Sequence, residues 1–101
     1  MFEECTAELQ MIRVFLDEGQ ADKDTHLCKV IRYDSQKECI YLLTGKSELS
    51  SFSLDGIYEC AITSGESVYK CKGTIRERYW CRAGKVIVFR VQNGFYKNNL
   101  N

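Results

Sequence analysis

The side chains in this sequence most able to bind a ligand are cations that alternate along one short segment. Lys70, Lys72 and Arg76 are spaced by even numbers of residues, so on a β-strand they lie on one face. Arg78 continues this spacing, and Trp80 follows at its end. Clustered cations beside aromatic rings can hold phosphate and stack a nucleobase. With two further arginines downstream, the candidate binding residues are Lys70, Lys72, Arg76, Arg78, Trp80, Arg82 and Arg90.

The same cations have two other interpretations. Strands that face water commonly carry Lys and Arg, which keep a surface soluble, and Glu59 and Glu77 are available to pair with them. Alternatively, an acidic partner binds here. Residues 1–50 hold six basic and ten acidic side chains, whereas residues 51–101 hold eight and four, so the acidic half of a second copy is also a candidate.

Catalytic and metal-binding patterns are sparse. The one histidine, His26, stands two residues before Cys28, but a zinc site needs about four convergent ligands, usually supplied as close pairs. A Cys–His nucleophile would also need an orienting third group and an oxyanion hole. The sequence contains no phosphate-binding loop, nucleophile elbow or metalloprotease motif. We therefore expect no enzyme activity, no metal and no cofactor.

The six cysteines indicate the cellular compartment. Their gaps of 23, 11, 21, 11 and 10 residues contain no close pair, and most of them lie in strand-like runs, where a reduced Cys packs as a small apolar side chain. The first residues are acidic rather than typical of a secretory signal, and no apolar run approaches the about 20 residues that span a bilayer. These features predict a cytoplasmic protein with buried free thiols that does not enter the membrane.

Short runs rich in Val, Ile, Tyr, Phe and Thr alternate with polar turns, and this pattern predicts an all-β fold. We expect one domain over residues 1–101, with its core at about 9–96, built as a small antiparallel barrel or split barrel of six or seven strands. The first run also has helical spacing, but Asp17 and Glu18 would place negative charge at the end of a helix, so a strand is preferred. The expected strands are 9–17, 25–33, 38–44, 57–63, 68–80 and 85–92.

Four smaller expectations concern local geometry. Gly73, inside the longest alternating run, predicts a bulge or sharp bend. The Asn93-Gly94 pair predicts a turn, after which Phe95 and Tyr96 fold back onto the end of the barrel. Phe52 and Leu54, in the polar connection after residue 44, are expected to point inward as anchors.

The order of these segments resembles the N-terminal barrel of bacterial flagellar-brake proteins, a domain that accompanies PilZ domains, the cyclic-di-GMP receptors. The resemblance covers residues 9–92 and is one of pattern. It is carried by VFLDEG, HLCKVIRYD, ECIYLLT, SLDGIYECAIT and YKCKGTIRERYW. It implies a non-enzymatic regulatory or adaptor module that acts through protein contacts or self-association.

PilZ domains themselves bind the dinucleotide with an RxxxR segment followed by DxSxxG. Residues 78–82 (RYWCR) fit the first pattern, and residues 51–56 (SFSLDG) fit the second except that Ser51 replaces the Asp. The order of the two segments is also reversed, which removes most of the support for a cyclic dinucleotide. Binding of a nucleotide or single-stranded nucleic acid to the basic face is the alternative function, although the balanced total of fourteen basic and fourteen acidic residues disfavours a general nucleic-acid binder.

Overall fold

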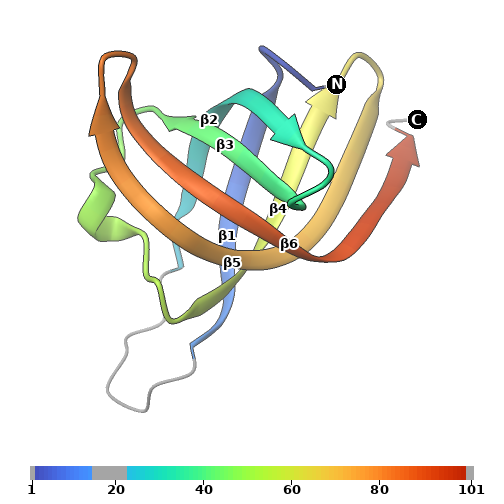
Figure 1. Ribbon diagram of the computed structural model, residues 1–101. Coiled ribbons are helices and arrows are strands. Elements are labelled where there is room, and N and C mark those ends of the chain that lie inside the picture. The colour runs from blue at the N-terminus through green and yellow to red at the C-terminus, as the bar shows by residue number, and fades with distance from the viewer. Residues whose placement is uncertain (1, 15–22, 100–101) are drawn as a thin grey trace.

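The chain folds into a closed barrel of six antiparallel strands, as predicted (Figure 1). The computed structural model describes residues 2–14 and 23–99. Around the barrel the strands follow the order β1-β2-β3-β6-β5-β4, and β4 closes it against β1. The strands are β1 (Thr6–Val14), β2 (Thr25–Asp34), β3 (Cys39–Thr44), β4 (Gly56–Ser64), β5 (Ser67–Cys81) and β6 (Gly84–Asn99).

Two three-stranded meanders build the barrel, and the segment that joins them contains one turn of 3-10 helix, η1 (Leu49–Ser51). Two side chains of this segment were expected to point inward. Phe52 does so and is fully buried, but the expectation for Leu54 is wrong, because this side chain is 47% exposed in the turn before β4. The described residues contain no helix long and apolar enough to cross a membrane.

The first run forms a strand, as preferred, as far as Val14. Residues 15–17 of the predicted strand and most of the loop after it lie outside the described residues. Leu9 points into the barrel, and a bulge between Met11 and Arg13 leaves Ile12 exposed. The core also begins earlier than predicted. Phe2 is buried at one end of the barrel, where its ring centroid lies 5.1 Å from that of Tyr69.

Strict alternation places the interior side chains of β4 and β5. Tyr58, Cys60 and Ile62 of β4 are fully buried, and Cys71 and Ile75 of β5 point inward beside them. The predicted face of Lys70, Lys72 and Arg76 accordingly points outward from this part of the barrel. The alternation that predicted the barrel is therefore confirmed over residues 70–76.

Gly73 lies where β5 bends, as predicted. The register of β5 against β6 shifts at this residue, and a Cβ atom placed on it would lie 2.0 Å from the carbonyl oxygen of Arg90. No side chain fits at that distance, so the close approach of the two strands requires glycine. Figure 1 shows both long strands curving around the barrel.

A second bulge in β5, between Ile75 and Glu77, inserts one extra residue. The side chains beyond it therefore point to the face opposite to the one that simple alternation predicts. Beyond it Glu77 and Tyr79 lie opposite the outward residues of β6, and Arg78 lies opposite Ile87, whose side chain is in the core. The prediction that Arg78 shares a face with Lys70, Lys72 and Arg76 is therefore wrong. The extra residue of the bulge cannot be seen in a pattern that counts every second position.

The predicted turn at Asn93-Gly94 is also wrong. β6 continues through this pair to Asn99. In this region the pairing of β6 with β5 shifts in register instead of ending in a turn. Phe95 still reaches the end of the barrel, as expected, because its ring packs against Phe2 and Tyr33 at centroid distances of 5.2 and 5.4 Å. The Tyr96 side chain lies outside the described residues.

Candidate partner-binding face

The structure separates the seven predicted site residues into three places. Lys70 and Lys72 lie on the outer surface of β5 beside β4. Their neighbour there is Glu59, which lies directly opposite Lys72 and whose carboxylate is 3.8 Å from the Lys70 ammonium. This part of the surface is a shallow groove of about 450 Å³ that also contains Glu8. Lys70 is therefore paired with a carboxylate, whereas Lys72 lies opposite the same residue without an ion pair among the described residues.

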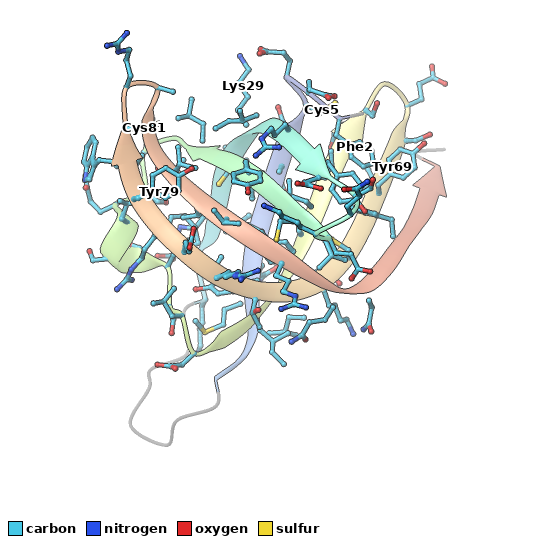
Figure 2. All side chains as sticks on the ribbon, viewed as in Figure 1. Phe2, Cys5, Lys29, Tyr69, Tyr79 and Cys81 are labelled. Atoms are coloured by element: carbon cyan, nitrogen blue, oxygen red, sulfur yellow. The ribbon has the colours of Figure 1, made fainter. Side chains whose placement is uncertain are left out.

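Arg78, Trp80 and Arg82 belong to the end of the β5–β6 hairpin. The Arg78 guanidinium donates hydrogen bonds to the carbonyl oxygens of Leu49 and Phe52, at 3.2 and 2.5 Å, and so ties the hairpin to the connection between the two meanders. Trp80, on the same side of the strand, is 69% exposed. Figure 2 shows this end of the barrel, at Tyr79 and Cys81, far from Phe2 and Tyr69.

Arg76 and Arg90 occupy the third place, on the outer surface near β3. Arg90 lies between Thr74 of β5 and Cys39 of β3, and Arg76 lies two residues beyond Thr74. Both arginines are exposed. They border a surface that the sequence analysis did not identify.

That surface, which we call the apolar face, lies on the outside of β3, β6 and the last part of β5. The register places Tyr41 beside Val88, and Leu43 beside Val86 and then Tyr79. Val86 and Val88 are only 1% and 3% exposed, yet neither belongs to the cluster of side chains that fills the barrel. The apolar face consists of Cys39, Tyr41, Leu43, Tyr79, Val86 and Val88.

The opposite outer surface has the composition expected of a barrel in water. Side chains of β1 and β4 that point outward there include Glu8, Gln10, Glu59 and Thr63. An antiparallel sheet with one solvated face normally shows this alternation of apolar and polar residues. The apolar face departs from it, because both faces of β3 and of the first half of β6 are apolar.

Two tyrosines enclose the valines of the apolar face from either side. The Arg32 guanidinium lies 4.1 Å from the centre of the Tyr41 ring, which it covers in a cation–π contact. Tyr79 belongs to β5, which lies on the other side of β6 from the strand of Tyr41. Partial desolvation raises the pKa of Tyr79, with smaller contributions from Cys81 and Tyr41. The two tyrosines therefore lie on the strands that flank Val86 and Val88, one on each side of β6.

A hollow of about 300 Å³ opens at the edge of this floor. Val88 and Cys39 supply its apolar part, and Tyr41 forms one side. Its charged side chains are Lys37, Arg76 and Glu77. A hollow with an apolar floor and a few charged groups at its margin is suited to receive a side chain from another molecule.

The cations around the hollow differ in their pairing. Arg32 is 3.9 Å from the Asp34 carboxylate. Lys37, Arg76 and Arg90 make no ion pair with any carboxylate that the structure describes. The margin of the apolar face thus carries positive charge that its own neighbours do not balance.

The groups inside the barrel have the properties of core residues. Burial raises the pKa of the Cys28 thiol to about 12, so at neutral pH it stays protonated, whereas a nucleophilic cysteine needs a lowered pKa. His26 is buried, with its Nδ1 2.6 Å from the Ser47 hydroxyl and its ring against Phe52. No three His, Cys, Asp or Glu side chains in the described ranges are arranged to hold a metal ion.

Four of the six cysteines are buried as free thiols, as predicted, but Cys5 is half-buried and Cys81 is exposed at the tip of the hairpin.

The chain matches no protein-family model, no curated protein and no solved structure. Its resemblance to the flagellar-brake barrel therefore stays a prediction.

Proposed function

We propose that this barrel is a non-enzymatic adaptor or regulatory module, and that a protein partner covers its apolar face. The observation that carries the proposal concerns Val86 and Val88, which lie between the strands of Tyr41 and Tyr79. Both valines point away from the core of the barrel and yet are buried. Antiparallel sheets commonly have one polar, solvated face. Here the outer face is apolar instead and is bordered by Tyr79, whose side chain is 39% exposed, and such a surface favours an interaction site. Buried free thiols accord with the cytoplasmic location that we propose for the module.

The predicted alternative, an anion bound along one basic strand, has less support. It needs Lys70, Lys72, Arg76 and Arg78 on a single face. Lys70 is paired with Glu59, and the guanidinium of Arg78 already donates to two backbone carbonyls on another face. The regulatory role implied by the flagellar-brake resemblance is compatible with the protein-binding proposal and needs no dinucleotide.

The proposal is tested by affinity capture with the full chain and two matched variants. Tyr79→Lys places a charge on the apolar face, whereas Thr63→Lys places the same charge on the polar face of β4; both side chains are exposed. We expect a protein from cells that express the chain to bind the wild type and Thr63→Lys but not Tyr79→Lys. Circular dichroism establishes that both variants fold. Identical sets of captured proteins on all three chains would contradict the proposal.

A further inference from the structure

The charges around the apolar face restrict what can cover it. Lys37 and Arg76 line the hollow, and Arg90 lies beside it, opposite Cys39. Within the described residues these cations make no ion pair, and Glu77 is the one carboxylate that lines the hollow. A partner that covered these cations with apolar atoms alone would remove their hydration without replacing it, which is unfavourable. Carboxylates on the partner would remove that cost.

The same charges disfavour a second copy of this chain as the occupant. In a two-fold symmetric dimer the same patch meets itself. Lys37, Arg76 and Arg90 would then face an identical set of cations, and like charges across an interface are unfavourable. A protein with opposite charge is the better fit.

The shape of the face disfavours a membrane surface. A membrane-binding patch projects apolar side chains into the lipid. Here Val88 and Cys39 are 3% and 2% exposed and form the floor of the hollow. A recess of this kind accepts a projecting side chain, as in the central pockets of protein interfaces.

We propose that the occupant of the apolar face is an acidic segment of another protein. One large aromatic or branched aliphatic side chain of this segment enters the hollow over Val88, beside Tyr41. Asp or Glu side chains on either side of it pair with Lys37, Arg76 and Arg90. This inference rests on the proposed function and adds the chemistry of the partner.

The test uses a phage-displayed library of random peptides, selected on the immobilised full chain. Peptides that also bind Tyr79→Lys are discarded, so that those retained depend on the apolar face. The retained peptides are synthesised with a fluorescent label, and their affinities are measured by anisotropy. The proteins compared are the wild type, the double variant Arg76→Glu/Arg90→Glu and the control Lys70→Glu, which changes a cation in the groove over β1 and β4.

We expect the retained peptides to be enriched in Asp and Glu around one aromatic or branched aliphatic position. The double variant should bind them at least about tenfold more weakly than the wild type, whereas Lys70→Glu should bind as the wild type does. Tyr79-dependent peptides with no acidic enrichment, or with unchanged affinity for the double variant, would overturn the acidic partner and leave the proposed function standing. Displacement of the peptides by oligothymidylate or by phosphatidylglycerol vesicles would assign the cations to phosphate and also overturn it. The absence of any Tyr79-dependent peptide would contradict the proposed function itself.

Discussion

Gly73 is the residue on which the curvature of the long hairpin most depends. A Cβ atom at this position would meet the Arg90 carbonyl at 2.0 Å and the Phe89 ring at 2.9 Å. Because one of these neighbours is backbone, the clash can be relieved only by moving a strand. The bend of β5 therefore follows from the absence of a single side chain.

We predict that Gly73→Ala lowers the free energy of unfolding by about 2–3 kcal/mol or more, the cost of overpacking a rigid site. Urea unfolding followed by circular dichroism measures this. Gly94→Ala is the matched control, since nothing lies within 4 Å of its added Cβ, and it should change the free energy by less than about 1 kcal/mol. Equal effects of the two variants would refute the close approach at Gly73.

The buried thiols make stability depend on alkaline pH. Burial raises the pKa of Cys28 from 9.0 to about 12. The pKa of Cys60 is also raised, by its hydrogen bond with Cys71 and then by burial. In both cases the folded chain holds a proton that the unfolded chain loses, so stability falls at alkaline pH. For Cys28 the stabilisation is complete below pH 9 and falls as the pH rises from 9 towards 12.

Cys28 should therefore remove about 1.4 kcal/mol from the free energy of unfolding between pH 8 and pH 10. Urea titrations in the presence of a reductant at the two pH values measure the loss. Cys28→Ala is less stable at both, because packing is lost, but its drop between the two pH values should be smaller than that of the wild type by about 1.4 kcal/mol. An equal drop in both proteins would show that Cys28 does not keep its proton on folding.

At the scale of elements, the β5–β6 hairpin is the part of the fold that depends on irregular pairing. The bulge after Ile75 turns Arg78 away from the face of Arg76 and towards the carbonyls of Leu49 and Phe52. One side chain thus holds the end of the hairpin against the connection between the two meanders.

Arg78→Ala should consequently lower the free energy of unfolding by about 1–2 kcal/mol, from the loss of two charged hydrogen bonds to carbonyls. Arg76→Ala, two residues away, should change it by less than about 0.5 kcal/mol, since Arg76 is exposed and makes no such bond. Chemical unfolding of both variants gives the comparison. If the two arginines contribute equally, the exchange of faces at the bulge is wrong.

The regular elements were predictable and the irregular ones were not. Alternation over residues 70–76 predicted the inward Cys71 and Ile75 correctly, and Gly73 indicated the bend. A single inserted residue reverses every face that follows it. For this reason Arg78 does not share the predicted face of Lys70, Lys72 and Arg76.

The sequence contains a pattern that corresponds to the apolar face, but it is not a periodic one. Residues 39–43 and 86–89 are unbroken apolar runs, which is the pattern of strands buried on both faces. Because runs of this length also fit barrel strands with one buried face, they do not by themselves predict a second apolar face. The hollow could not be predicted, because it depends on how Tyr41, Arg76 and Val88 meet across three strands.

At the scale of the whole molecule, the barrel has two unlike outer surfaces. The surface over β1 and β4 is polar, and its groove contains the ion pair of Lys70 with Glu59. The surface over β3 and β6 is apolar, with unbalanced positive charge at its margin. This difference between the two sides is the basis of the binding proposal.

The isolated chain should remain a monomer of 11.7 kDa at concentrations of tens of micromolar, because the cations of the apolar face oppose a symmetric dimer. Size-exclusion chromatography with light scattering, at low and high salt, tests this. A dimer that persists at low salt and is abolished by Tyr79→Lys would show that a second copy occupies the face, and would contradict the acidic partner.

The most direct test of the central claim is an NMR titration of the isotope-labelled full chain with a captured partner or a selected peptide. We predict that the largest changes in chemical shift fall on Tyr41, Leu43, Tyr79, Val86 and Val88, and that Glu8, Glu59 and Thr63 stay unchanged. Changes concentrated on the groove over β1 and β4, with the apolar face unaffected, would contradict the account.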